Sequence, residues 1–291
     1  MPKTWFITGA SRGLGVAIAK SALKAGDNVV ATARVPASIA QRIGPNDQQL
    51  YAVPLAVEDS VQASAAVSAG LSRFGQIDFL VNNAGFGYYG FFEESTPDEV
   101  SELFATNLFG VLNVTRAVLP HMRSRRAGRI FNLSSLGGLV GAQLGSLYCA
   151  SKFAVEGFSE SLAKEIAPFG ISVTIVEPGP FRTEFLTPQS IRKSRLAIPD
   201  YESRRAALLA GVAERSGRQP GDPERLAQAL VTLARTPTPP LRFLAGEVAN
   251  AVVEEKLAGM RGDFDAWREL SLSTDGIFDA TGIGGMVEQI R

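Results

Sequence analysis

Tyr148 and Lys152 combine residue types and a spacing that could do chemistry. They lie four positions apart in a stretch of helical character, so both side chains fall on one face, one turn apart. A tyrosine hydroxyl alone has a pKa of about 10 and is a weak base at neutral pH, whereas a nearby ammonium favours the phenolate and lowers that pKa. The pair is therefore suited to moving a proton onto or off an oxygen atom. The ordinary alternative is a buried tyrosine beside a surface lysine.

Ser135 lies thirteen positions before Tyr148, at the carboxyl end of a predicted strand. Ligands of open parallel sheets bind at that end. A hydroxyl there can hydrogen-bond a carbonyl oxygen and stabilise the negative charge that develops on it. Adjacent serines also cap turns, so this serine alone only suggests such a role.

A glycine-rich turn, Thr8–Gly15, lies between the first predicted strand and the first predicted helix. Glycines let the backbone turn sharply and approach a pyrophosphate, whose charge is met by free amides and the helix N-terminus. Glycine clusters are often plain turns, but the strand-turn-helix context favours dinucleotide binding. The turn residues predicted to contact the cofactor are Gly9, Ser11, Arg12, Gly13, Leu14 and Gly15.

The end of the second predicted strand bears on which dinucleotide is bound. A chain that binds NAD usually has an acidic residue there for the ribose hydroxyls, and this chain has Ala33, followed by Arg34. Arg34 and Arg12, with no carboxylate, fit a 2′-phosphate better than a free hydroxyl. These residues favour NADP over NAD; the alternative is that one or both arginines are solvated surface residues.

Short apolar runs alternate with longer stretches of helical character, which is typical of βαβ units and a parallel sheet buried on both faces. Right-handed crossovers then predict a Rossmann-type, doubly wound α/β fold of about seven strands. We expect strands at Trp5–Thr8, Asn28–Thr32, Gln49–Leu55, Ile77–Asn82, Arg129–Leu133, Ser172–Val176 and Leu241–Leu244. We expect helices at Leu14–Ala25, Val61–Phe74, Pro97–Met122 and Leu147–Ala167.

The 291 residues contain neither an internal repeat nor a proline- and serine-rich linker, which predicts a single domain over residues 1–291. The composition changes after Pro178. Residues 183–221 are polar, rich in arginine and alanine, and lack a clear strand, so we interpret them as a substrate-loop insertion. We expect a C-terminal helical appendage over about residues 246–291.

The composition is ordinary for a soluble globular enzyme, with 45% hydrophobic and 20% charged residues. The 29 basic and 29 acidic residues balance, so nothing suggests a nucleic-acid partner or an electrostatic membrane anchor. The lone Cys149 excludes an internal disulfide, and with the lone His121 it predicts no metal site. No apolar stretch has the length of a signal peptide or a membrane span, so the expected location is cytoplasmic.

Together these motifs resemble the single-domain branch of the short-chain dehydrogenases/reductases over about residues 3–186. Thr8–Gly15 matches that family's Thr-Gly-x-x-x-Gly-x-Gly motif, and residues 82–85 match its Asn-Asn-Ala-Gly motif. Asn107, Ser135, Tyr148 and Lys152 match its catalytic residues in order and spacing. The C-terminal part is similar to a hydroxysteroid-dehydrogenase-like subgroup.

The resemblance implies a role for each matching residue. Tyr148 would give a proton to a carbonyl oxygen as hydride arrives from NADPH, or take it back in oxidation, while Ser135 orients that carbonyl. Lys152 would lower the tyrosine pKa and hold the nicotinamide ribose, and Asn107 would position a water that links Lys152 to solvent. Further cofactor contacts are implied at Arg34, Val57, Asn83, Ala84, Gly85, Tyr148, Lys152, Pro178, Gly179 and Thr183. The chain departs from the family at Ala56, where an aspartate is common; this removes a polar contact near the adenine, and Val57 could still pack there.

Apolar residues near the predicted site suggest an apolar pocket, which would suit a lipophilic ketone or alcohol as the small-molecule substrate. The alternative is that most of the aromatic residues among them belong to the core or to a dimer surface. Family members commonly pair through two long helices, here about 97–122 and 147–167, so a homodimer or homotetramer is expected. The candidate lining residues are Phe86, Tyr88, Tyr89, Phe91, Phe92, Leu136, Leu139, Val140, Leu144, Phe181, Phe185 and Leu186.

Two rival functions stay open. One is NAD-dependent oxidation of an alcohol, against which Arg12, Arg34 and Ala33 argue. The other, from a different class, is a catalytically silent sensor or scaffold that binds NADP. A binding module has no physical need for a tyrosine-lysine pair opposite a serine, so the sequence favours an enzyme.

Overall fold

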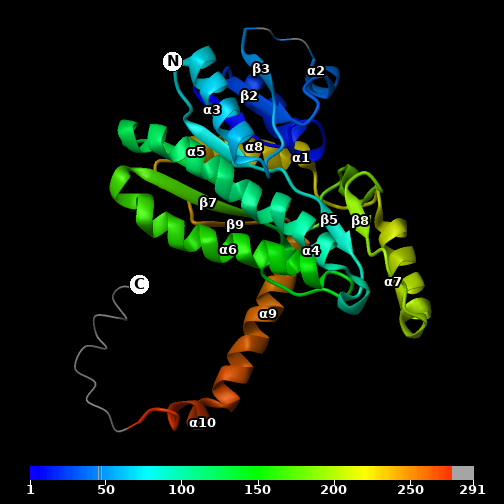
Figure 1. Ribbon diagram of the computed structural model, residues 1–291. Coiled ribbons are helices and arrows are strands. Elements are labelled where there is room, and N and C mark those ends of the chain that lie inside the picture. The colour runs from blue at the N-terminus through cyan, green and yellow to red at the C-terminus, as the bar shows by residue number, and fades with distance from the viewer. Residues whose placement is uncertain (45, 47, 277–291) are drawn as a thin grey trace. The chain divides into compact units, whose positions relative to one another are not determined.

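Seven parallel strands form the main sheet, in the order β3-β2-β1-β4-β6-β7-β9 (Figure 1). The computed structural model describes residues 1–44, 46 and 48–276. The doubly wound α/β fold is confirmed, and each strand lies within about one to two residues of its predicted bounds. The strands are β1 (Thr4–Ile7), β2 (Asn28–Ala33), β3 (Leu50–Pro54), β4 (Phe79–Asn82), β6 (Gly128–Leu133), β7 (Ile171–Pro178) and β9 (Arg242–Ala245).

The first strand shows why the sheet is buried on both sides. Successive side chains of a strand point to opposite faces. Accordingly Trp5 and Ile7 belong to one hydrophobic cluster, Phe6 belongs to the other, and all three are fully buried. A continuous apolar run is therefore what this sheet requires.

Helices complete a layer on each side of the sheet. One layer is formed by α1 (Gly13–Lys24), α2 (Ala37–Ile43) and α8 (Pro223–Arg235). The other is formed by α3 (Ser60–Phe74), α5 (Gly110–Arg125) and α6 (Ser146–Ile166). Full burial of an aliphatic side chain contributes about 1.5–3 kcal/mol, so these layers fix the sheet whose carboxyl edge carries the predicted site.

The predicted helix Pro97–Met122 is interrupted. The structure has α4 (Pro97–Phe104), a π-helical turn at Ala105–Phe109, and then α5. By length and composition alone Pro97–Arg125 would qualify as a membrane span, but Val114, Val118 and Met122 are packed in the core.

The substrate-loop insertion contains regular structure that the sequence did not indicate. The segment expected to lack a strand contributes β8 (Ile191–Lys193), which pairs in parallel with β5 (Gly87–Tyr89). It also forms α7 (Glu202–Arg215). The three-residue strand was missed because its pairing partner lies about a hundred residues earlier in the chain.

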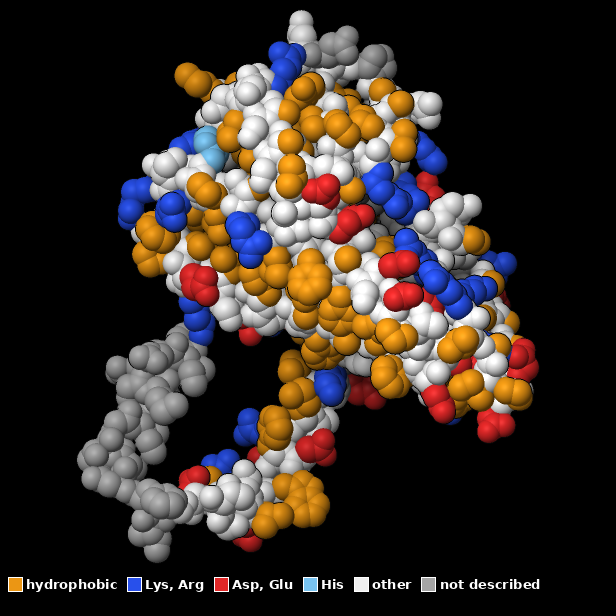
Figure 2. Space-filling model, in the orientation of Figure 1, with side chains coloured by type: hydrophobic (Ala, Val, Ile, Leu, Met, Phe, Trp, Pro, Cys, Tyr) orange, Lys and Arg blue, Asp and Glu red, His pale blue; other side chains and the backbone are white. Residues whose placement is uncertain are grey.

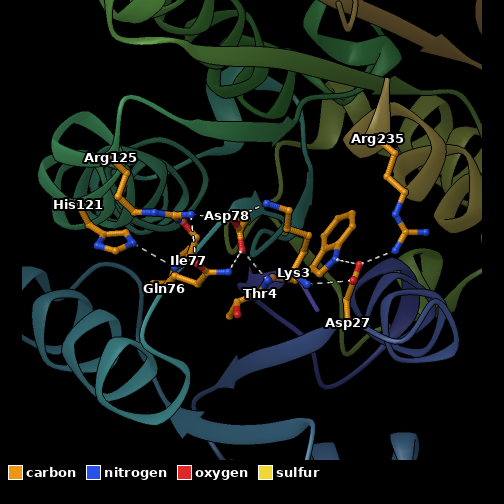
Figure 3. Close-up of polar contacts among 10 residues, drawn as sticks. Lys3, Thr4, Asp27, Gln76, Ile77, Asp78, His121, Arg125 and Arg235 are labelled. Carbon is orange, nitrogen blue, oxygen red and sulfur yellow. Dashed lines mark hydrogen bonds and ion pairs between the residues drawn. The ribbon is translucent and has the colours of Figure 1, made fainter. Parts of the chain in front are cut away.

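Two buried carboxylates hold the strand ends at the edge opposite the predicted site (Figure 3). Asp78 accepts hydrogen bonds from the Thr4 amide at 2.9 Å and from Arg125 Nη2 at 3.1 Å. Asp27 accepts from Trp5 Nε1 and from Arg235 Nη2, both at 2.9 Å. These contacts join β1 to α5 and α8.

The same network includes two residues near the end of α5. Arg125, in the basic run at 123–126, pairs with the buried carboxylate of Asp78. His121 is partly buried. Its Nε2 accepts a hydrogen bond from the Ile77 amide at 3.2 Å (Figure 3).

The chain separates into two compact units, Met1–Ala251 and Val252–Arg291. The C-terminal helices are α9 (Glu247–Ala266) and α10 (Arg268–Leu272), where the helical appendage was expected. In the second unit Leu257, Phe264 and Trp267 are exposed. The predicted appendage runs to residue 291, and residues 277–291 lie outside the described residues.

Candidate active site

Tyr148 and Lys152 lie in the first two turns of α6, beside the carboxyl ends of β4 and β6. Lys152 is buried, and its Nζ donates a hydrogen bond to the Leu133 carbonyl, the last residue of β6, at 2.7 Å. The same Nζ lies 6.0 Å from the centroid of the Tyr148 ring. The helical spacing thus brings the phenol and the ammonium to one side of α6, as the sequence predicts.

Burial dominates the electrostatics of the pair. It raises the pKa of Tyr148, and a hydrogen bond with Ser135 opposes that rise. It also lowers the pKa of Lys152 to about 8, although the negative charge of Glu156 acts to raise that pKa. At neutral pH Tyr148 therefore holds its proton and can give it away, while Lys152, with its pKa of about 8, is mainly in its ammonium form.

Ser135 leaves β6 in extended backbone and turns back toward α6. Its Oγ accepts a hydrogen bond from the Gly137 amide at 3.1 Å and lies near enough to the Tyr148 hydroxyl to lower the pKa of Tyr148. A Cβ at Gly137 would lie only 3.2 Å from Tyr148 Cε1, so the loop passes close to the phenol. The serine and the tyrosine can therefore meet one substrate oxygen.

Asn107 occupies the middle of the π-helical turn and is fully buried. Its Oδ1 accepts from the Phe86 amide and its Nδ2 donates to the Phe86 carbonyl, both at 3.0 Å. Nδ2 also donates to Ser151 Oγ at 3.2 Å. The side chain thus ties the loop after β4 to α6, which is a typical use of a π-turn at a functional site.

The glycine turn is shaped by steric needs that only glycine meets. A Cβ at Gly15 would lie 2.4 Å from the Gly9 carbonyl oxygen, and Gly9 and Gly13 have φ of 66° and 53°. Asn83 Nδ2 donates to the carbonyls of Thr8 and Gly9 at 2.8 and 3.1 Å. These contacts hold the turn against the end of β4.

Thr8 begins the matched glycine motif, but it was not among the residues predicted to contact the cofactor. Its Oγ1 accepts from the amides of Asn83 and Ala84 at 2.9 and 3.0 Å. The hydroxyl therefore fixes the spacing between the glycine turn and the Asn-Asn-Ala-Gly segment. Gly85 follows, and a Cβ there would lie 3.2 Å from Asn107 Oδ1 and 3.8 Å from Lys152 Nζ.

The amide of Gly13, at the start of α1, already binds a carboxylate. It donates to Glu184 Oε2 at 3.2 Å, and Glu184 Oε1 accepts from Arg42 Nη1 at 3.1 Å. Glu184 was not among the predicted residues, because nothing in the local sequence links it to a turn 171 positions away. The contact indicates that this helix N-terminus attracts anions.

Arg12 and Arg34 are neighbours in the fold. Burial and then the Arg34 charge lower the pKa of Arg12, while Glu184 raises it. Arg34 is exposed and Arg12 is half-buried, and neither forms an ion pair with any residue that the structure describes. The two predicted cations therefore remain available to a bound anion.

The other predicted cofactor residues lie around the same edge. Thr183 meets the glycine turn: a Cβ at Gly13 would lie 3.5 Å from Thr183 Cβ. Pro178 ends β7, and the Gly179 amide donates to the Ala245 carbonyl at 3.0 Å. Val57 is buried, and its Cγ2 would be 2.5 Å from a Cβ at Gly110, so it packs against α5. Ser11 and Leu14 lie in the turn and the first turn of α1, both partly buried.

A groove of about 990 Å³ runs along the outer side of the glycine turn, between α1 and α8. Arg12, Gly13, Thr183 and Glu184 border it. Ser135, Tyr148 and Lys152 are not among its lining residues. The reaction centre, which hydrogen bonds and burial define, therefore lies apart from this groove.

The apolar residues expected to line a pocket separate into different environments. The Phe185 ring lies 5.9 Å from that of Tyr148, so the loop after β7 reaches the reaction centre. In contrast Phe92 is 68% exposed, and Phe91 stacks on Tyr201 with ring centroids 4.5 Å apart. Phe181 packs with the core.

Comparison with known families matches residues 3–193 to the model of the short chain dehydrogenases. The chain belongs to the short-chain dehydrogenase family. It is 38% identical over 275 residues to the oxidoreductase BOA17 of Botryotinia fuckeliana, spanning 94% of this chain and 100% of the relative. It is 37% identical over 251 residues to a 3-ketodihydrosphingosine reductase of Bacteroides thetaiotaomicron, spanning 86% and 90%.

Solved structures agree with this placement. A short-chain dehydrogenase from Streptomyces avermitilis superposes with a TM-score of 0.86 at 38% identity, covering 95% of this chain and 100% of that one. ElxO with NADP bound gives 0.67 at 28% identity, covering 81% and 92%. A 3-ketoacyl-(acyl-carrier-protein) reductase from Brucella melitensis complexed with NADH gives 0.66 at 30%, covering 80% and 90%. This short-chain dehydrogenase is thus an oxidoreductase with a fold that binds nicotinamide cofactors.

Proposed function

We propose that this short-chain dehydrogenase reduces a carbonyl group, or oxidises the corresponding secondary alcohol, with NADP(H). The observation that carries the proposal is the meeting of Ser135, Tyr148 and buried Lys152 at the carboxyl edge of the sheet, next to the glycine turn. A binding protein without catalysis would not need a buried ammonium beside a phenol, because burying that charge costs free energy.

The residues present fit NADP(H). Gly9, Gly13 and Gly15 leave space that a Cβ would fill, and the Gly13 amide already binds an anion. Arg12 and Arg34 would hold the 2′-phosphate. When bound, the cofactor supplies the hydride, and the protein supplies geometry and electrostatics.

The chain's own residues then have separate tasks. Tyr148 gives its proton to the substrate oxygen in reduction and takes it back in oxidation. Ser135 donates a hydrogen bond to the same oxygen and orients it. Lys152, held by the Leu133 carbonyl, stabilises the phenolate that remains after the proton has left.

We propose a lipophilic substrate. The Phe185 ring lies 5.9 Å from that of Tyr148, and the partly buried Tyr89 lies nearby, since its phenolate would oppose deprotonation of Tyr148. An apolar wall with few polar groups suits a hydrocarbon chain or ring system. The relative named for 3-ketodihydrosphingosine, a long-chain ketone, supports the same class. The cytoplasmic location and the homo-oligomeric state stay predictions.

The test of cofactor choice is a fluorescence titration of the apo-protein with NADPH and NADH at fixed salt. We expect NADPH to bind at least tenfold more tightly, a difference of about 1.4 kcal/mol. The replacement Arg34→Ser should remove most of that preference, because Arg34 would bind the 2′-phosphate, which NADPH has and NADH lacks. Equal or tighter binding of NADH would favour the rival, an NAD-dependent alcohol oxidation, which the NADH complex of one structural neighbour keeps in view.

The test of the reaction is Tyr148→Phe in a screen of lipophilic ketones with NADPH. We expect turnover to fall by about 10² or more, because the proton donor is lost, while the Kd for NADPH stays within a factor of about two. Near-normal turnover would remove Tyr148 from this role. Absence of turnover in the wild type with intact NADPH binding would favour the silent sensor.

A further inference from the structure

One cluster of charged residues, with two buried carboxylates and a partly exposed arginine, lies outside the groups already given a task. The cluster consists of Glu156 on α6, Glu177 on β7 and Arg242 on β9. Arg242 Nη1 donates to Glu156 Oε2 at 2.6 Å and to Glu177 Oε1 at 2.5 Å. Both carboxylates are buried, with 5% and 1% of their residue surface exposed.

The cluster is one helical turn from Lys152. Glu156 follows Lys152 by four positions within α6, so the two side chains lie on the same face. Lys152 needs a counter-charge, because its only hydrogen bond among the described residues goes to the neutral Leu133 carbonyl. Around the ammonium lie Tyr148 on the same helix, Asn107 of the π-helical turn behind Gly85, and Glu156, which is the acidic group that acts on it.

The charge of Glu156 is not fully neutralised by Arg242. One oxygen, Oε2, bonds the guanidinium, whereas the buried Oε1 has no hydrogen-bond partner in the part of the chain that the structure describes. Oε1 faces the loop that carries Ser135: a Cβ at Gly138 would lie 2.9 Å from it and 2.3 Å from Ser134 Oγ. Arg242 is also shared with Glu177 and with the exposed Glu160, whose Oε1 accepts from Nη2 at 2.5 Å.

We propose that Glu156 is a positioning residue for the reaction, and that its buried carboxylate, in a charge cluster with Glu177 and Arg242, keeps Lys152 in its ammonium form. This role rests on the proposed function of Tyr148 and Lys152. Glu177 makes the cluster respond to pH, since burial and the Glu156 charge raise the pKa of Glu177 to about 7. The carboxyl proton of Glu177 then limits the negative charge packed around one guanidinium.

The first experiment compares pH profiles of kcat/KM for NADPH-dependent reduction in the wild type and in Glu156→Gln. Reduction needs a protonated Tyr148 and an ammonium at Lys152. Removing a nearby negative charge lowers the pKa of both groups, so the alkaline limb should move to lower pH by half a unit or more. Glu165→Gln, the same change at an exposed position of α6, is the control and should leave the limb in place.

An alkaline limb that does not move in a folded Glu156→Gln protein would overturn the proposal, as would an equal movement in Glu165→Gln. Folding is checked by the thermal unfolding midpoint. Because the glutamine remains close in shape, it can still accept from Arg242.

A second measurement does not depend on turnover. With its pKa raised from 4.5 to about 7, Glu177 binds a proton in the folded state that the unfolded chain releases at lower pH. The stability it contributes is therefore present at acid pH and is lost as the pH rises to about 7. Glu177→Gln should flatten the fall of the unfolding midpoint between pH 5 and pH 8.

The two measurements separate the possible failures. Suppose that Glu177→Gln flattens the dependence of the unfolding midpoint on pH, but the wild type turns over no ketone. The charge cluster would then be supported and the proposed reaction would be wrong. If Glu177→Gln leaves the fall of the unfolding midpoint between pH 5 and pH 8 unchanged, the proposed charge cluster is wrong, whatever the reaction proves to be.

Discussion

The carboxylate of Glu184 lies at the N-terminus of α1, where backbone amides would stabilise a bound phosphate most. It bonds the Gly13 amide at the N-terminus of α1 and pairs with Arg42, which is itself 58% exposed. A phosphate bound at the same turn would meet this negative charge. Like charges about 4 Å apart in water repel by about 1 kcal/mol.

We therefore expect Glu184→Gln to bind NADPH more tightly, by about three- to tenfold at low salt. The affinity is measured by fluorescence titration. Glu224→Gln, which changes another carboxylate bordering the same groove, is the control and should shift the affinity less. Unchanged binding in Glu184→Gln would mean that its carboxylate does not face the cofactor.

Sequence motifs found the residues whose roles depend on near neighbours. Tyr148 and Lys152 are joined by helical spacing, and Gly13 and Gly15 by the geometry of one turn. Glu184 was out of reach because its contact with Gly13 depends on how two distant loops pack. The same reason hides Glu156, whose partners lie on separate strands of the sheet.

Among the structural elements, the π-helical turn at Ala105–Phe109 shows what periodicity cannot predict. An apolar pattern favours one helix over 97–122, and a one-residue insertion changes that pattern little. Yet the insertion carries Asn107 and aims its amide at Phe86 and Ser151. Strand number and class were predictable, because buried parallel strands demand apolar runs. The pairing of β5 with β8 was not, since three-residue strands carry almost no pattern.

The strand edge away from the active site supports a prediction about stability. Asp78→Ala would leave the Thr4 amide and the Arg125 guanidinium without their buried partner. We expect a loss of about 3 kcal/mol in the free energy of unfolding, because breaking a buried pair leaves a charge uncompensated. Chemical denaturation measures the change.

Lys3→Ala is the matched control for that substitution. Lys3 bonds the same carboxylate at 3.2 Å, but its side chain is 49% exposed. Its loss should cost less than about 1 kcal/mol. Equal costs for the two variants would show that Asp78 is held by its exposed partner rather than by Thr4 and Arg125.

For the whole molecule, the exposed aromatic residues bear on assembly. Phe109 and Phe153 are 52% and 45% exposed on the two long helical segments through which family members commonly pair. Figure 2 shows apolar side chains gathered among charged ones on the face that α5 and α6 occupy in Figure 1. Aromatic groups of this kind are favoured at the centre of interfaces.

We expect the wild type to be a homodimer or homotetramer and Phe153→Asp to shift it toward monomer, because a buried unpaired charge opposes association. Light scattering after size exclusion measures the mass. Leu196→Asp, at a 50% exposed position outside those helices, should leave the mass unchanged. A wild-type monomer, or a Phe153→Asp protein of unchanged mass, would exclude α6 as the interface.

The two tryptophans of the chain lie one in each compact unit. Trp5 is fully buried and donates its indole N–H to Asp27, whereas Trp267 is 65% exposed. Each unit therefore carries its own intrinsic fluorophore, one buried and one exposed to solvent. Iodide should quench the red-shifted emission of Trp267 and spare that of Trp5, so a single emission spectrum recorded during heating would separate the melting of the Rossmann-type unit from events in the C-terminal helices.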